Sequence, residues 1–201
     1  SKESLLVRVY NGFARLFIEL ADYKIACTDE SNTWLWDGKA DLVLPYSMNL
    51  AQFEYNLNDR YKIRKDSRTD DSKIVIGHIG RFSKQKNQKF LLEIFSFLSD
   101  EKYELWIIGA GELEKEIKSY AKELRLQNIK WFPPVSDVEK FYSAFDIFLL
   151  PSLWEGLGIV GIESQCSGLP TIISDVLPID LNQSDLLHRL TLDCNPKHWS
   201  E

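Results

Sequence analysis

The sequence predicts an α/β fold with a parallel sheet and helices on both faces. From about residue 71 onward, apolar runs rich in isoleucine and valine alternate with segments of helical periodicity. Glycines follow the first two apolar runs directly, in "IGHIG" and "IIGAG". Strands that alternate with helices imply right-handed crossovers, and therefore a sheet that is parallel and covered on both sides.

Each element of this alternation is defined by its pattern and its flanking residues. The apolar, β-branched runs predict strands over 73–80, 103–111, 128–132, 146–152 and 170–174. The periodic segments predict helices over 87–100, 112–126 and 136–145, the last one capped, and a helix that starts near Gly158. The strand over 170–174 is expected to close the series.

The first 70 residues have a different character. Residues 4–21 predict an amphipathic helix, residues 23–28 a short apolar run, and residues 60–73 a charge-dense helix end followed by a linker. We therefore divide the chain into residues 1–70, the end of another domain with its connection, and residues 71–201. The helix over 4–21 fits a piece of a larger domain better than a membrane-surface helix, and its apolar face predicts self-association of the fragment.

Composition excludes several classes of protein. With 201 residues and 44% hydrophobic residues, the chain can bury a core of its own. A net charge of −6, without a dense stripe of lysine and arginine, argues against a nucleic-acid surface. The three cysteines suggest neither a disulfide framework nor a zinc site, so a cytoplasmic setting is expected. The histidines, His78 among them, are expected to be structural or exposed.

The residues with chemical potential lie where the predicted strands end. Ligands of parallel α/β sheets bind at the carboxyl ends of the strands. Gly80, Arg81 and Lys86 follow the first strand, and the two cations could converge on a phosphate. Gly109 and Gly111 follow the second strand in "GAGE", which lacks the third glycine of a dinucleotide fingerprint and is also typical of a tight turn.

The stretch "PSLWEGLGIVGIESQCSGLP" places two glutamates on either side of a predicted helix start. A helix N-terminus attracts anions, so a diphosphate could bind the free amide groups around Gly156, Leu157 and Gly158. Carboxylates accept hydrogen bonds from pairs of hydroxyls, which sugars supply on both sides of a diphosphate. We expect Glu163 to hold a ribose and Glu155 to hold a transferred sugar.

Taken together, "GRFSKQKN", "LWIIGAGELEKEI" and the Glu-x7-Glu stretch resemble family 4 retaining glycosyltransferases. The similarity is to the carboxyl-terminal, nucleotide-sugar-binding domain of the two-Rossmann-domain (GT-B) enzymes, and most of all to the branch that builds capsular and exopolysaccharides. It runs from about residue 73 to residue 175. The resemblance places base contacts near Val135, where Pro133 and Pro134 replace a glycine common in the family.

The resemblance implies a chemistry and a set of roles. The parent enzyme would move a sugar from a nucleoside diphosphate, with UDP as the family-based expectation, to a hydroxyl acceptor with retention at the anomeric carbon. Arg81 and Lys86 would stabilise the leaving diphosphate, and Glu155 would orient the donor sugar. No Asp-x-Asp occurs, as a metal-independent enzyme without a cofactor would imply.

The resemblance also implies what lies outside this sequence. A lipid-linked or oligosaccharide acceptor would bind the missing amino-terminal domain, so the fragment alone is expected to be inactive and truncated at its end. Such an enzyme would be cytoplasmic or peripheral at the inner face of the cell membrane. Two alternatives stay open: an enzyme of the same architecture with other chemistry, an epimerase or a phosphorylase, and a non-catalytic nucleotide-binding module.

Overall fold

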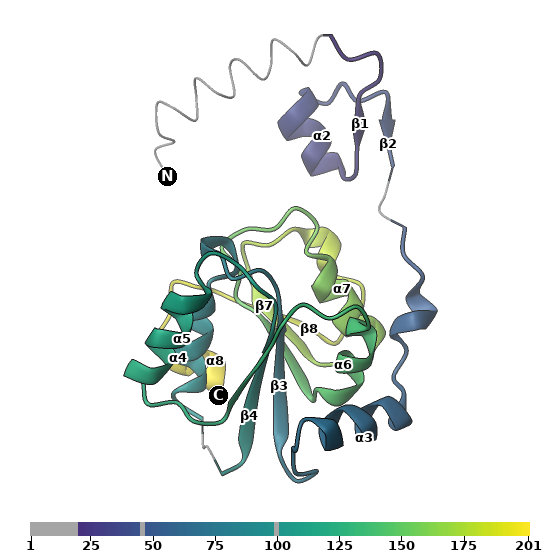
Figure 1. The fold of residues 1–201 in the computed structure, drawn as a ribbon. Helices are drawn as coiled ribbons and strands as arrows, with labels where there is room; N and C mark the ends of the chain where they lie inside the picture. The colour runs from purple at the N-terminus through teal and green to yellow at the C-terminus, as the bar shows by residue number, and fades with distance from the viewer. Residues whose placement is uncertain (1–19, 45–46, 99–100) are drawn as a thin grey trace. The chain divides into compact units, whose positions relative to one another are not determined.

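The structure, a computed structural model, describes residues 20–44, 47–98 and 101–201. The chain divides into two compact units, Ser1–Met48 and Asn49–Glu201, which we treat separately (Figure 1). The amphipathic helix expected over 4–21 falls almost entirely on residues 1–19, outside the described residues. Within the described ranges, no helix has the length and hydropathy that spanning a bilayer requires.

In the first unit, two short strands and one helix form a small parallel βαβ unit. Strand β1 (Ile25–Ala26) pairs with β2 (Leu42–Val43), and helix α2 (Asp29–Trp36) connects them. Helix α2 begins at a capping box, in which the backbone N–H of Ser31 and the side chain of Thr28 lie 3.0 Å apart and the reciprocal bond is also made. Strand β1 lies inside the short apolar run over 23–28, and helix α2 is an element that the sequence analysis did not predict.

The second unit is built on a six-stranded parallel sheet in the order β5-β4-β3-β6-β7-β8. Its strands are β3 (Ile74–Ile79), β4 (Tyr103–Ile108), β5 (Ile129–Phe132), β6 (Ile147–Leu150), β7 (Thr171–Ser174) and β8 (Leu187–Leu190). Counted from β3, this order is the 3-2-1-4-5-6 arrangement of doubly wound dinucleotide-binding folds. The predicted fold class is thus confirmed.

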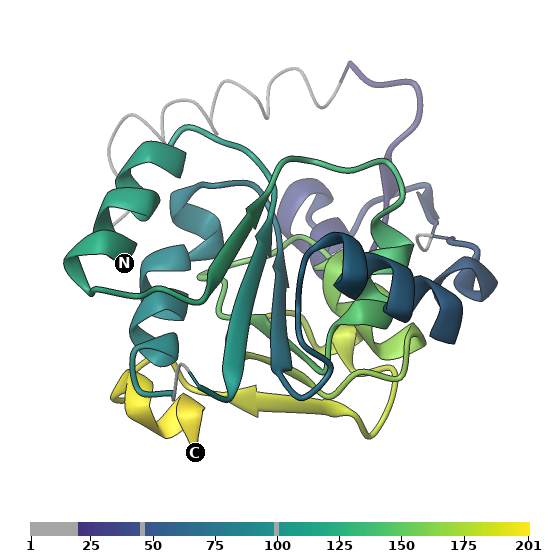
Figure 2. The ribbon, with the colours of Figure 1, turned by 60° about the horizontal axis from the view of Figure 1, so that its bottom comes forward.

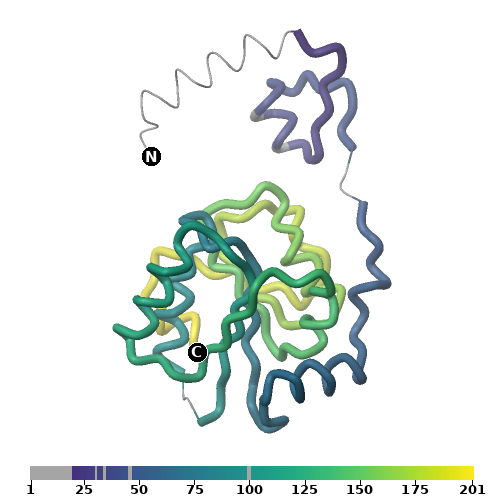
Figure 3. Tube along the Cα trace, in the orientation of Figure 1, coloured from purple at the N-terminus to yellow at the C-terminus, as the bar shows by residue number. Residues whose placement is uncertain are grey.

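Helices cover both faces of this sheet (Figure 2). Helices α4 (Gln88–Phe95), α5 (Glu114–Glu123) and α8 (Pro196–Ser200) pack on one face, and α3 (Leu57–Asp66), α6 (Val138–Ala144) and α7 (Ile159–Cys166) on the other. Three short 3-10 helices complete the unit: η1 (Leu50–Phe53), η2 (Lys84–Lys86) and η3 (Ile179–Leu181). The trace in Figure 3 shows the chain returning at its end to lie beside α4.

The core lies between the central strands and these helices. Val75, Leu105, Ile107 and Phe148 are fully buried, and each such side chain contributes about 1.5–3 kcal/mol of burial free energy. Gly77 faces the ring of Phe145, whose nearest atom would lie 2.2 Å from an added Cβ. A glycine in β3 is therefore what allows this ring to reach the sheet.

The structure corrects several predicted elements. The sheet does not close at β7, because β8 adds a sixth strand and α8 follows it; Trp199 of α8 donates from Nε1 to the carbonyl oxygen of Thr191 over 2.9 Å. Helix α4 ends at Phe95, well before residue 100. Helix α6 has no side-chain cap, since the carboxylate of Asp137 bonds Lys140 at 3.0 Å instead.

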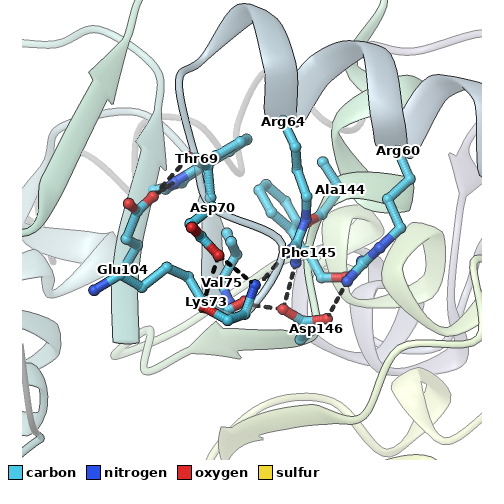
Figure 4. A network of polar contacts seen from close by, with 12 residues as sticks. Arg60, Arg64, Thr69, Asp70, Lys73, Val75, Glu104, Ala144, Phe145 and Asp146 are labelled. Atoms are coloured by element: carbon cyan, nitrogen blue, oxygen red, sulfur yellow. Dashed lines mark hydrogen bonds and ion pairs between the residues drawn. The ribbon is translucent and has the colours of Figure 1, made fainter. Parts of the chain in front are cut away.

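Helix α3 belongs to the second unit because two of its arginines bind Asp146, the residue directly before β6 (Figure 4). The guanidinium of Arg64 lies 2.5 Å from one carboxylate oxygen of Asp146, and that of Arg60 lies 2.7 Å from the other. Arg64 also donates to the carbonyl oxygens of Ala144 (3.0 Å) and Lys73 (3.1 Å). The compact division therefore falls between Met48 and Asn49, earlier than the boundary at residue 70 expected from the sequence.

Candidate donor-binding site

The sheet order brings two predicted loops together at its topological switch point. Because all six strands are parallel, the loops that follow them lie at one edge of the sheet. The order reverses between β3 and β6, so the connections after these two strands leave in opposite directions. These connections are residues 80–87 and 151–158, which contain seven of the predicted site residues: Gly80, Arg81, Lys86, Glu155, Gly156, Leu157 and Gly158.

Hydrogen bonds join these two loops to each other. The backbone N–H of Leu153 donates to the carbonyl oxygen of Gln85 over 2.8 Å, and the side chain of Gln85 donates to the carbonyl oxygen of Trp154 over 2.9 Å. The side-chain amide of Asn87 donates to the carbonyl oxygen of Pro151 over 3.1 Å. The loops therefore form one cross-linked structure.

At the centre of this structure, Lys86 and Glu155 form a largely buried ion pair. The ammonium lies 2.7 Å from Oε1 of Glu155, and the two side chains are 13% and 7% exposed. The same oxygen accepts from the hydroxyl of Ser152 over 2.7 Å, and Oε2 accepts from Gln85 over 3.1 Å. A Cβ on Gly80 would lie 2.9 Å from the Lys86 side chain. Gly80 thus leaves room for Lys86 beside the backbone.

Arg81 lies outside this pair. Its Nε is 3.1 Å from the carboxylate of Glu112, and both side chains are well exposed, at 72% and 55%. Surface ion pairs of this kind contribute about 0–1 kcal/mol, so an incoming anion could recruit Arg81 away from Glu112 at little cost. The structure does not bring the two predicted cations into contact, although both belong to the loop after β3.

The N-terminus of α7 is open to an anion. Gly158 precedes the helix with a φ of +69°, a conformation that glycine adopts readily, and no side chain caps the helix. Within the described part of the chain, the backbone N–H groups of residues 157–160 donate to no acceptor. Unpaired N–H groups and the helix dipole both favour negative charge here, next to the loop that carries Glu155.

Glu163 lies further along α7 and turns toward α6. Its Oε2 accepts a hydrogen bond of 2.6 Å from the hydroxyl of Tyr142. Burial raises the pKa of Glu163 above its ordinary value, while the hydrogen bond from Tyr142 acts in the opposite direction. The pKa of the Tyr142 phenol is raised in turn, first by burial and then by the charge of Glu163.

The remaining predicted residues lie in neighbouring loops at the same edge. Gly109 and Gly111 follow β4, Gly156 and Leu157 precede α7, and Val135 lies partly exposed between β5 and α6. No hydrogen bond or ion pair described for the chain links Val135 to the other predicted residues. Among the residues described, histidine, cysteine and acidic side chains form no cluster of three that could hold a metal ion.

Sequence reasoning missed the residues that orient the predicted ones. Ser152 and Gln85 bind Glu155, and Tyr142 binds Glu163. Ser152 and Gln85 lie inside the two loops after β3 and β6, three residues from Glu155 and one from Lys86, but polar residues are common in loops. The sequence did not mark Tyr142 as a candidate site residue, because a tyrosine in an amphipathic helix is ordinarily part of the core.

Gly111 and Gly109 hold the loop after β4 against the loop after β3. A Cβ on Gly111 would lie 2.4 Å from the carbonyl oxygen of Phe82, and one on Gly109 would lie 2.1 Å from that of Gly80. We expect Gly111→Ala to lower the free energy of unfolding by about 1–3 kcal/mol, because rigid backbone must move. Gly156→Ala is the matched control, since nothing lies within 4 Å of its added Cβ. Equal denaturant midpoints for the two variants would contradict this account.

A parallel, doubly wound sheet with this strand order is the architecture of dinucleotide-binding α/β folds. Residues 59–180 match the family described as "Glycosyl transferases group 1". Since this match covers more than half of the chain, the protein belongs to the group 1 glycosyl transferases, which have the GT-B fold and resemble family 4.

Relatives of similar sequence agree with this membership. The chain is 30% identical over 201 residues to EpsF of Bacillus subtilis, a protein named as a glycosyltransferase, covering 94% of this chain and 52% of EpsF. It is 31% identical over 135 residues to the capsular polysaccharide biosynthesis glycosyltransferase CapM of Staphylococcus aureus, covering 65% of this chain and 36% of CapM.

Among solved structures, the fold is similar to that of HepE of Anabaena in complex with UDP-glucose. The TM-score is 0.80 at 18% sequence identity, over 94% of this chain and 56% of HepE. The chain thus spans about half the length of EpsF, and less of CapM.

Proposed function

We propose that this chain is the donor-binding part of a retaining glycosyltransferase. The parent enzyme moves a sugar from a UDP-sugar to a hydroxyl acceptor in the synthesis of a surface polysaccharide or exopolysaccharide. The donor diphosphate binds between the N-terminus of α7 and the loop after β3. The nucleotide lies toward Glu163 and the transferred sugar toward Glu155.

The observation that carries this proposal is the Lys86–Glu155 pair at the switch point. An ammonium has three N–H donors. Glu155 takes one of them at 2.7 Å, which holds the nitrogen in place and leaves donors for phosphate oxygens. The open amides at the start of α7 follow Glu155 directly in the chain. A cation and a helix N-terminus that meet at one place suit a diphosphate better than either does alone.

In this proposal the charged residues act mainly in the transition state. Negative charge grows on the diphosphate as the bond to the sugar breaks, so a fixed cation stabilises the transition state more than the bound donor. Lys86 is held by its partners before the donor arrives, and Arg81 joins when it leaves Glu112. These cations and the helix dipole take the place of a metal ion. Glu155 orients the donor sugar.

The proposal predicts a loss of UDP affinity when either cation is removed. Charge-assisted hydrogen bonds contribute about 1.5–3 kcal/mol, so Lys86→Ala and Arg81→Ala should each weaken UDP binding about tenfold to a hundredfold. Calorimetric titration measures the effect. Lys84→Ala, an exposed lysine of the same turn, is the matched control and should change affinity little. If the wild-type chain gave no response to UDP or UDP-sugars, a non-catalytic module of another kind would replace this proposal.

Substitutions of the two glutamates should weaken the binding of different ligands. Glu163→Ala should weaken UDP but have much less effect on a 2′,3′-dideoxy analogue, which has no ribose hydroxyls to lose. Glu155→Gln keeps an acceptor for Lys86, so it should spare UDP and weaken only the sugar-bearing donor. Equal losses for UDP and its dideoxy analogue in Glu163→Ala would show that the ribose assignment is wrong.

A further inference from the structure

Tyr142 is a buried phenol whose hydroxyl ends beside the carboxylate of Glu163. The side chain is fully buried, and its ring contacts Phe53, with 5.9 Å between ring centroids, and Phe148, with 5.6 Å. Phe53 belongs to η1, and Phe148 to β6. Packing from two elements fixes the ring, so the position of the hydroxyl is determined before any ligand binds.

The hydroxyl has two acceptors within reach, and they are not equivalent. Oε2 of Glu163 lies 2.6 Å away, and the carbonyl oxygen of Val160 lies 3.3 Å away. A bond to a carboxylate is about twice as strong as one between neutral groups, so the proton points at Glu163. No described residue donates to the other oxygen, Oε1, which leaves it open as an acceptor.

We propose that Tyr142 is a positioning residue for nucleotide recognition: its hydroxyl holds one oxygen of Glu163, so that the other oxygen accepts from the ribose hydroxyls. This inference rests on the proposed function, because it assumes that Glu163 binds the ribose. It adds a residue that does not touch the ligand. Without Tyr142, the carboxylate would be free to rotate about its side-chain bonds and would carry its proton to higher pH.

The charges around Glu163 support this role. Burial raises the pKa of Glu163, the carboxylate of Glu139 on α6 raises it further, and the hydrogen bond from Tyr142 lowers it. Cys166, on α7 itself, interacts with the charge of Glu163. Asp180 of η3 is exposed, and η1, β6 and β7 bring no titratable side chain to α7. The Tyr142 hydroxyl is thus the one hydrogen-bond donor described that lowers the pKa of this carboxylate.

The test uses Tyr142→Phe, which keeps the ring and its packing. The quantity measured is the ratio of the affinities for UDP and 2′,3′-dideoxy-UDP, because protonation of the phosphates cancels in this ratio. At neutral pH the ratio should fall about threefold to tenfold in Tyr142→Phe, the effect of one hydrogen bond. As the pH is lowered, the ratio should decline at a higher pH than in the wild type. Tyr120→Phe, which removes a phenol that donates to Glu93 over 2.8 Å, is the matched control.

The outcomes distinguish this inference from the proposed function. If Glu163→Ala leaves the ratio unchanged, the ribose assignment fails and the role of Tyr142 fails with it. If Glu163→Ala abolishes the preference while Tyr142→Phe changes neither the ratio nor its pH dependence, only the inference is overturned. A measurement without ligand decides the same point: carbon NMR titration should show a higher pKa for Glu163 in Tyr142→Phe, and an unchanged value would overturn the proposal.

Discussion

Asp146→Ala is expected to lower the free energy of unfolding by about 3–5 kcal/mol, the usual cost of leaving a buried charge without its ion-pair partner. Arg64 is 1% exposed and would keep its charge without the carboxylate that neutralises it. Arg60 would lose its ion-pair partner as well. The backbone N–H of Val75 would lose the carboxylate oxygen to which it donates over 2.7 Å. The effect should appear as a lower denaturant midpoint.

The chain provides a matched control on the same helix. Lys62 and Asp66 of α3 form an ion pair at 3.2 Å with both side chains well exposed, so Asp66→Ala should change stability by less than about 1 kcal/mol. A double variant, Asp146→Ala with Arg64→Met, should recover part of the loss because no buried charge remains unpaired. If Asp146→Ala and Asp66→Ala were equally stable, the ion pairs of Asp146 with Arg60 and Arg64 would contribute little to the free energy of unfolding.

Acidification from pH 6.5 to pH 4 is expected to cost about 3 kcal/mol of stability through His78 alone. Burial lowers the pKa of His78 to about 4, from 6.5, against a hydrogen bond to the carbonyl oxygen of Leu149 that acts the other way. Between these values the unfolded chain binds a proton that the folded chain does not. The contribution is therefore fully present above pH 6.5 and is lost as the pH falls toward 4.

The pH dependence of unfolding in His78→Asn isolates this contribution from that of the carboxyl groups. The variant should lose stability less steeply over this window than the wild type, whatever its stability at neutral pH. His188→Asn, which replaces an exposed histidine of β8 in the same way, is the matched control. Parallel curves for wild type and His78→Asn would mean that the histidine is protonated in the folded state.

The sequence predicted the sheet well because its strands are buried on both sides and therefore read as unbroken apolar runs. All residues from Val75 to His78 and from Leu105 to Ile108 are buried, whereas a strand with one face in solvent would alternate buried and exposed residues. Strand β8 was not predicted, for the opposite reason. It lies at the edge of the sheet, where His188 and Arg189 can face outward, so its four residues carry no apolar run.

The loops that carry the predicted residues follow β3, β4 and β6 as the sequence indicated, but the contacts inside these loops were not predictable. The rule for parallel sheets fixes the edge, and glycines mark the loops. Which charges pair depends on side-chain directions that spacing does not encode: Lys86 meets Glu155, 69 residues away, while Arg81 meets Glu112. The packing of α3 on the second unit could not be predicted for a similar reason. A helix with so many charged residues is expected to face solvent, although Arg64 is buried against Asp146.

The attachment of α3 also decides where such a chain can be cut or recombined. Enzymes made of two halves can be engineered by exchanging one half, and success depends on a seam that few contacts cross. A seam at residue 70 would remove α3 and leave Asp146 and the carbonyl oxygen of Ala144 without the arginines that bind them. A seam between Met48 and Asn49 carries both arginines with their acceptors. A module for grafting should thus begin at Asn49, so that α3 stays with the sheet whose residues its arginines bind.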